Sequence, residues 1–244
     1  MVTDFVEVLV SDLRRQEHKA SLETCGFEIR GLRSTMAYED FGGQERVDAV
    51  YVEDVKTQLR EDFGASHIDI MRVRVRRRHP HFPLSIGTSF EHHQPSTAAH
   101  IDTTMDSAKA MVKDLLLHTG QSCRQGYFQI LNVWKPLRGP LEDWPLAVCD
   151  QQTVDTTTDL AQSTILHQDY ANHNCQVHYN KNQRWFYLSR QQPDEIMIFR
   201  QFDSRRPGNN GTPHSSFADP STPAQATPRE SVEVMAVLHF QPKI

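Results

Sequence analysis

The hydrophobic positions of the chain predict two amphipathic helices. Apolar residues recur at spacings of three and four over residues 44–63, which is typical of a helix with one buried face, and Gly64 is placed to end it. Residues 107–118 show the same spacing, with Ser107 as a candidate N-cap and Gly120 as the end.

Most of the remaining chain has the shorter patterns that are typical of β-strands. Residues 66–76 alternate apolar and polar positions, apart from one change of phase near Met71 that would fit a β-bulge. Residues 204–228 are rich in Gly, Pro, Ser and Thr and predict a long loop. Many short strands with turns between them predict a mainly β protein, a sandwich or barrel with flanking helices. The later β-type runs cover residues 127–134, 165–170, 176–180, 184–188, 195–202 and 231–240.

Length favours a single domain. The 244 residues, with a mass of 28.1 kDa, can enclose one substantial core. We expect one domain over residues 1–244, in which residues 1–60 form an N-terminal extension of helix and strand and residues 61–244 form the β core.

Charge and apolar content limit the partners. A net charge of −5 argues against a general nucleic-acid binder, which needs a basic surface to displace counterions. No apolar run approaches the roughly 20 residues that span a membrane, and the N-terminus lacks a signal-peptide pattern. We therefore expect a cytoplasmic protein whose partners are small molecules or proteins, and the sequence is compatible with a homodimer. The cysteines are widely scattered and are expected to be free thiols: Cys25, Cys123, Cys149 and Cys175.

His100 and Asp102 form the first half of a candidate metal site. Residues two apart in a strand point to the same face, so this imidazole and carboxylate would converge. His214 follows much later, and Arg229 and Ser231 share a face by the same rule. Two imidazoles and one carboxylate bind Fe(II) on one face and leave three positions open for a cosubstrate and dioxygen. The arginine and the serine would hold the distal carboxylate of 2-oxoglutarate by charge-assisted hydrogen bonds.

A second H-x-D sequence, His67–Asp69, competes with His100–Asp102. Its strand continues into an arginine-dense segment that would bring positive charge near a cation, whereas His100–Asp102 has no basic neighbours close in sequence. We therefore choose His100 and Asp102 as ligands. His92 and His93 are adjacent, so only one of them could face a metal. The arginines of the competing strand are expected on a solvated face that passes into a loop: Arg72, Arg74, Arg76, Arg77 and Arg78.

Residues 132–150, NVWKPLRGPLEDWPLAVCD, carry a resemblance to a known family. The string closely resembles a signature of fungal and bacterial iron/2-oxoglutarate oxygenases, a group that includes the fungal gibberellin desaturase, secondary-metabolite hydroxylase/desaturases and the cephamycin 7α-methoxylase component. Further stretches that resemble this family lie at residues 64–78, 100–104, 180–188, 193–204, 214–220 and 228–234. The resemblance implies a double-stranded β-helix core of the jelly-roll or cupin type. It also implies that Fe(II) is held by His100, Asp102 and His214, and 2-oxoglutarate by Arg229 and Ser231.

Five other residues are candidates for the pocket. Asn132 would face the cosubstrate and Arg138 a substrate carboxylate, while Trp134 would form either a substrate wall or core. Trp185 and Tyr187 share a strand face and would line the cavity, although aromatic residues on strands are more often core.

These features together predict a non-haem Fe(II)/2-oxoglutarate-dependent dioxygenase. It would use dioxygen to hydroxylate or desaturate a small-molecule substrate of secondary metabolism. Two alternatives remain: a metal-dependent isomerase or hydrolase on the same fold, and a catalytically silent barrel that binds a small ligand.

Overall fold

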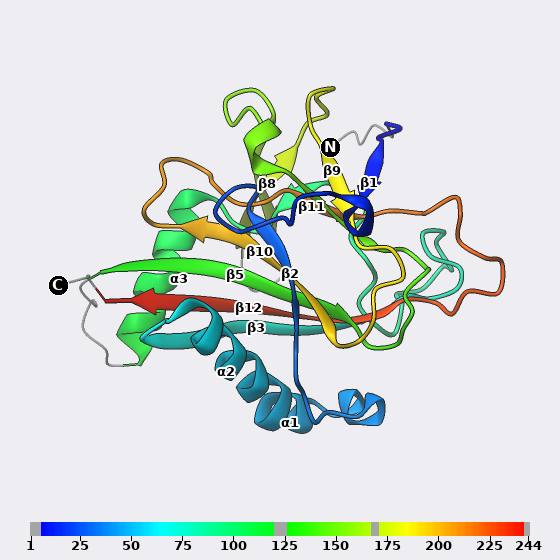
Figure 1. Cartoon of the computed structure of the whole chain (residues 1–244), viewed down its shortest axis with the longest axis horizontal. Coiled ribbons are helices and arrows are strands. Elements are labelled where there is room, and N and C mark those ends of the chain that lie inside the picture. Colours follow the sequence, from blue (N-terminus) through cyan, green and yellow to red (C-terminus); the bar gives the residue numbers. More distant parts are fainter. Residues whose placement is uncertain (1–5, 120–125, 167–170, 242–244) are drawn as a thin grey trace.

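A computed structural model describes residues 6–119, 126–166 and 171–241 of the chain. It consists of two facing β-sheets with helices at their periphery (Figure 1). The strand order is β1-β9-β6-β11-β4-β8-β7 in the seven-stranded sheet and β2-β10-β5-β12-β3 in the five-stranded sheet. The mainly β fold with flanking helices and a jelly-roll core that the sequence predicted is confirmed.

The elements have the following bounds. The helices are α1 (Gln44–Arg46), a π-helical turn (Val47–Tyr51), α2 (Val52–Phe63) and α3 (Met105–His118). The strands are β1 (Val10–Asp12), β2 (Phe27–Gly31), β3 (His67–Arg77), β4 (His100–Ile101), β5 (Tyr127–Pro136), β6 (Leu146–Cys149), β7 (Leu160–Leu166), β8 (Ala171–Val177), β9 (Trp185–Tyr187), β10 (Glu195–Asp203), β11 (His214–Ser216) and β12 (Glu230–Phe240).

The first predicted helix covers the outer face of the five-stranded sheet. In Figure 1 α1 and α2 lie below this sheet, on the side away from β8, β9 and β11. Val47, Val55 and Leu59 from the helical segment pack against strand residues such as Val133 and Val234, and all five are buried. Gly64 adopts a left-handed conformation (φ 66°) at the C-terminus of α2, as the sequence predicted.

The N-cap of the second predicted helix lies three residues earlier than the sequence indicated. Helix α3 starts at Met105, and its N-cap is Thr104 rather than Ser107. The hydroxyl oxygen of Thr104 accepts a hydrogen bond from the backbone N–H of Ser107 (3.1 Å). The sequence has a capping residue at both positions, and the difference arises because the turn after β4 already leaves Thr104 extended. The predicted end at Gly120 lies outside the described residues.

Strand β3 contains the predicted bulge. Met235 of β12 pairs with Arg72, whereas Ala236 pairs with Ile70, so Met71 is the extra residue on β3. Beyond the bulge, Arg74 pairs with Glu233 and Arg76 with Ser231. Because directly paired residues point to the same face of a sheet, these arginines face the space between the two sheets.

The expectation of a solvated arginine face is therefore wrong for Arg72, Arg74 and Arg76. They are half-buried and face the interior. Arg77 points to the other side of β3, where it contacts Glu230 (3.5 Å) and the carbonyl of Phe41 (3.3 Å). Arg78 forms a buried ion pair with Asp143 (2.6 Å). The predicted alternation of residues along this strand is confirmed. The prediction was wrong about which face of the strand meets solvent.

Candidate metal centre

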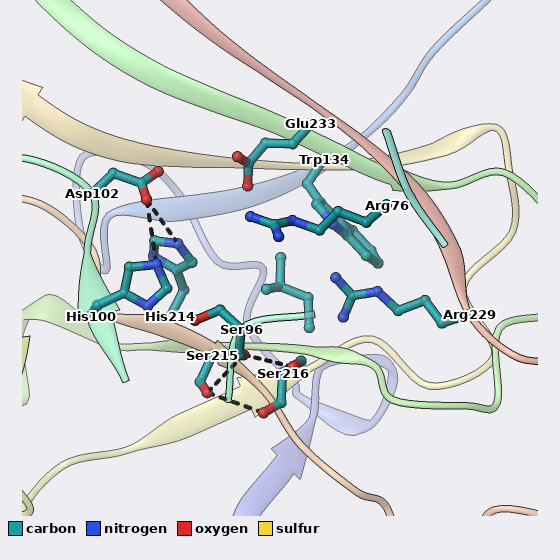
Figure 2. Close-up of a pocket in the computed structure, with 11 residues that line it drawn as sticks. Arg76, Ser96, His100, Asp102, Trp134, His214, Ser215, Ser216, Arg229 and Glu233 are labelled. Atoms are coloured by element: carbon teal, nitrogen blue, oxygen red, sulfur yellow. Dashed lines mark hydrogen bonds and ion pairs between the residues drawn. The ribbon is translucent and has the colours of Figure 1, made fainter. Parts of the chain in front are cut away.

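The three predicted ligands lie on neighbouring strands of the seven-stranded sheet. His100 on β4 pairs directly with His214 on β11, and Asp102 is the residue that immediately follows β4. The Oδ1 atom of Asp102 lies 3.4 Å from Nε2 of His100 and 3.9 Å from Nε2 of His214. The ligand atoms all lie within 4.8 Å of one another, and Figure 2 shows both rings turned towards the carboxylate. The structure thus brings together all three predicted ligands.

Backbone carbonyls orient both imidazoles. Nδ1 of His100 donates to the carbonyl of Ala98 (2.7 Å), and Nδ1 of His214 donates to the carbonyl of Thr212 (3.2 Å). A carbonyl can only accept, so each Nδ1 carries the hydrogen and each Nε2 presents a lone pair to the centre. Burial, followed by the nearby His100, lowers the pKa of His214 to about 3, so this ring is neutral, as a metal ligand must be.

The second oxygen of Asp102 is held by two donors. Oδ2 accepts from Nδ2 of Asn132 (2.7 Å) and from Nη2 of Arg72 (3.2 Å). Burial alone would raise the pKa of Asp102, but its interactions with His100, His214 and the Arg72 guanidinium hold that pKa well below its ordinary value. This carboxylate is therefore ionised and has only Oδ1 available for a metal.

A buried guanidinium lies across the pocket from the ligands. Arg229 is 3% exposed, and its Nη1 donates to the carbonyl of Trp144 (2.8 Å) and its Nε to Oγ of Ser231 (3.3 Å). Within the described part of the chain no carboxylate forms an ion pair with the Arg229 guanidinium. Burial, together with the nearby Arg76, lowers the pKa of Arg229 to about 9. A buried cation without a counter-ion is an unfavourable arrangement unless an anion joins it.

Three further residues take part in the site that sequence reasoning did not assign to it. Arg76 and Glu233 line the same pocket as the ligands, and Arg72 links Glu233 (3.2 Å) to Asp102. The guanidinium of Arg76 points into the pocket beside that of Arg229 (Figure 2). The sequence contained a usable signal, because Glu233 continues the period-two series of Arg229 and Ser231.

The remaining pocket candidates divide into two groups. Trp134 lines the pocket under the Arg229 guanidinium (5.0 Å from the ring centre), and Asn132 contacts the predicted ligand Asp102 instead of open space. Arg138 is exposed and stacks on the ring of Tyr38 (3.8 Å), away from the pocket-lining residues.

Trp185 and Tyr187 lie on the outer face of the seven-stranded sheet. Val148 of β6 pairs with His214 and Phe186 and packs with Trp134 in the core between the sheets. Trp185 and Tyr187 flank Phe186 and therefore point the other way, where Trp185 packs in a separate cluster with Cys149 and Val154. The structure thus confirms that these two side chains share a face but does not place them in the metal pocket.

The competing H-x-D sequence forms a separate cluster. His67 and His239 each contact one oxygen of Asp69, both at 2.9 Å, at the opposite end of β3 from Arg76. Among the described residues only His100, Asp102 and His214 form a group able to hold a metal ion. Cys25, Cys149 and Cys175 are buried free thiols, and Cys123 lies outside the described residues.

The fold and this site define a class: proteins with a double-stranded β-helix core and a His-Asp-His centre between their sheets. The chain belongs to the family described as YDMC, Oxidoreductase/YMDC permease-like domain, which matches residues 1–239. No described helix has the length and apolar content needed to cross a membrane.

Named relatives agree with this class. The chain is 28% identical over 237 residues to the Fe(II)/2-oxoglutarate-dependent dioxygenase nvfI of Aspergillus novofumigatus, covering 95% of this chain and 82% of the relative. It is 25% identical over 253 residues to the hydroxylase/desaturase efuI of Hormonema carpetanum, covering 96% and 83%. Aspirochlorine biosynthesis protein N of Aspergillus oryzae is 39% identical over 123 residues, 48% of this chain and 50% of the relative.

Solved structures agree as well. A variant of the iron and alpha-ketoglutarate-dependent endoperoxidase NvfI superposes with a TM-score of 0.80 at 26% identity, covering 95% of this chain and 82% of that one. The resemblance to iron/2-oxoglutarate oxygenases of fungal secondary metabolism that the sequence carried is thereby confirmed.

Proposed function

We propose that the protein is an Fe(II)/2-oxoglutarate-dependent oxygenase that hydroxylates or desaturates a small-molecule secondary metabolite. His100, Asp102 and His214 hold the iron. Arg229 and Ser231 anchor the distal carboxylate of 2-oxoglutarate. The named relatives, which include dioxygenases and hydroxylase/desaturases, support the reaction type.

One observation supports the proposal most strongly: the three ligand atoms share a pocket with a buried guanidinium that lacks an anionic partner. The donor set fits ferrous iron, because two neutral imidazoles and one carboxylate are the ligands of non-haem Fe(II) oxygenases. The unpaired Arg229 fits the distal carboxylate of a dicarboxylate, because its fork matches carboxylate geometry.

Bound iron, together with 2-oxoglutarate and dioxygen, would supply the oxidising power for attack on an unactivated C–H bond, with dioxygen as the oxidant. The protein's own residues determine how the metal ligands are oriented. Asn132 and Arg72 occupy Oδ2 of Asp102, so the carboxylate offers a single oxygen. Oδ1 of Asn132 is buried and has no hydrogen-bond partner among the described residues.

The cosubstrate end of the pocket is built from β12 and β3. Arg229 is fixed in direction by the carbonyl of Trp144, which leaves its other terminal nitrogen for an anion. The Arg76 guanidinium beside it adds positive charge, and its Nη1 is held by the carbonyl of Gln94 (2.6 Å). Trp134 forms the floor between the two ends, where its ring excludes water.

A decarboxylation assay tests this function. Purified protein with Fe(II), ascorbate and 2-oxoglutarate labelled at C1 should release labelled carbon dioxide and an equal amount of succinate, faster with a suitable substrate than without one. Zn(II) in place of Fe(II) should abolish release. Turnover of a substrate without succinate formation would contradict the proposal and favour an isomerase or hydrolase. The cytoplasmic location and the homodimer expected from the sequence stay predictions.

A further inference from the structure

Arg74 lies half-buried beside the metal pocket, and its guanidinium is not engaged by a hydrogen bond or ion pair from the described part of the chain. It pairs across the sheet with Glu233, which in turn pairs with Trp134, and both of these residues line the pocket. The Arg74 side chain therefore lies on the same face as the pocket wall.

The two arginines beside it are already engaged. Arg72 contacts Asp102 and Glu233, the two carboxylates that line the pocket, at 3.2 Å each. Arg76 lines the cosubstrate end and donates to the carbonyl of Gln94. Arg74 lies between them on the strand, but it is not part of the lining around Arg229. It is thus a third guanidinium in the row, and the proposed cosubstrate does not account for it.

Arg74 lies on an edge strand beside the pocket. Strand β3 is the edge strand of the five-stranded sheet, so an incoming molecule can reach this side chain from solvent. The charged and titratable groups near Arg74 are Glu233, Asp102, Arg72, Arg76 and His93. Burial lowers the pKa of Arg74, and Arg72 and Arg76 lower it further, which reflects the unfavourable environment of an unmatched cation.

We infer that Arg74 binds a carboxylate on the organic substrate, so that the enzyme prefers acidic small molecules. The inference rests on the proposed function, because the substrate is defined as the molecule that joins iron and 2-oxoglutarate in the pocket. A guanidinium fork can hold a carboxylate through two parallel hydrogen bonds, and partial burial strengthens this contact relative to a fully exposed one. Such a contact would orient the substrate with its anionic end at the edge of β3 and its body towards the ligands.

The test compares acids with their methyl esters. Protein loaded anaerobically with Fe(II) and saturating 2-oxoglutarate is titrated by calorimetry with fused-ring and long-chain carboxylic acids, each paired with its methyl ester. Wild-type protein should bind at least one acid about 10-fold to 100-fold more tightly than its ester. Arg74→Gln should remove this preference, and Arg74→Lys should retain part of it.

Arg77→Gln is the matched control, because Arg77 lies on the same strand and points to the opposite face. It should keep the preference for acids, and thermal unfolding should show that both glutamine variants are folded. The inference is wrong if no acid is preferred by the wild type, or if Arg74→Gln keeps the preference. It is also wrong if Arg74→Gln mainly weakens 2-oxoglutarate binding, which would assign the residue to the cosubstrate.

Failure of the proposed function has a different signature. It would appear as wild-type protein that binds neither Fe(II) nor 2-oxoglutarate. Failure of the inference about Arg74 alone would leave the binding of Fe(II) and 2-oxoglutarate intact.

Discussion

The two oxygens of Asp102 have different environments, and this difference decides how the residue can act. Oδ1 faces Nε2 of both histidines, whereas Oδ2 accepts from Asn132 and Arg72. A carboxylate with one oxygen occupied in this way binds a metal through the other, which keeps further coordination positions open. Partners of metal ligands commonly change metal affinity by 10-fold to 100-fold when they are removed.

Asn132→Ala should therefore weaken metal binding without unfolding the protein. We expect the dissociation constant for Mn(II), measured by electron paramagnetic resonance, to rise about 10-fold to 100-fold. Asn182→Ala, at an exposed position, serves as the control and should leave the dissociation constant for Mn(II) unchanged. An unchanged Mn(II) affinity in Asn132→Ala would show that the hydrogen bond to Oδ2 has no part in holding the ligand.

Arg229 would recognise the cosubstrate through both its positive charge and the shape of its guanidinium. Arg229→Gln should raise the dissociation constant for 2-oxoglutarate about 100-fold, because a charge-assisted contact is lost in a buried pocket. Arg229→Lys keeps the charge but not the fork and should raise it about 10-fold. Calorimetry on the Mn(II)-loaded protein measures both. If both variants raised the dissociation constant for 2-oxoglutarate only slightly and equally, the distal carboxylate of 2-oxoglutarate would have to bind somewhere other than Arg229.

At the scale of elements, the loop before β11 positions the last ligand. Thr212 donates its hydroxyl to the carbonyl of Gly26 (2.8 Å) and its N–H to that of Arg200 (2.7 Å), and its own carbonyl orients His214. Gly211 lies so close to the chain that an added Cβ would meet the carbonyl oxygen of Gln201 at 2.6 Å and the side chain of Ile101. Ile101 separates two metal ligands, so the loop and β4 are tightly coupled.

Gly211→Ala should disturb both stability and the metal centre. We expect a loss of about 1–3 kcal/mol in the free energy of unfolding, since the neighbouring backbone cannot yield easily. Mn(II) affinity should fall as well. Gly31→Ala is the matched control, because an added Cβ there meets nothing within 4 Å. Urea unfolding compares the two variants, and an equal stability would contradict the close packing of this loop.

The sequence predicted those parts of the site that follow from local periodicity. The H-x-D and R-x-S pairs each converge because residues two apart share a strand face. Periodicity also predicted that Trp185 and Tyr187 share a face, but it could not tell which face meets the metal. Likewise it could not place Arg72 beside Asp102, because that contact depends on how two sheets face each other.

For the whole molecule, a buried lysine lies where the N-terminal helical segment packs against the five-stranded sheet. Lys135 of β5 is 5% exposed and donates to the carbonyl of Pro193 (2.9 Å), and its ammonium lies 5.3 Å and 5.5 Å from the ring centres of Phe41 and Tyr51. Burial lowers the pKa of Lys135 from its ordinary value of 10.5 to about 8. The unfolded chain therefore binds this proton more tightly than the folded protein does.

This difference gives stability a pH dependence of known sign. The free energy of unfolding should rise with pH between about 8 and 10.5, and the destabilisation should be fully present below pH 8. Lys135→Met removes the destabilisation caused by the buried ammonium but also loses its hydrogen bond. The net effect should be a gain of roughly 1–2 kcal/mol in the free energy of unfolding at pH 7. Lys113→Met, at an exposed position, should keep the wild-type profile. Urea unfolding from pH 7 to 10 measures all three proteins, and parallel profiles for wild type and Lys135→Met would contradict the account.

The central claim is that His100, Asp102 and His214 hold one ferrous ion beside 2-oxoglutarate. Anaerobic addition of Fe(II) and 2-oxoglutarate should give the weak visible charge-transfer absorption of a chelated 2-oxo acid in wild-type protein. His214→Ala and Asp102→Ala should abolish it, while His67→Ala, from the other H-x-D sequence, should retain it. The same absorption in His214→Ala or Asp102→Ala, or none in the wild type, would contradict the account.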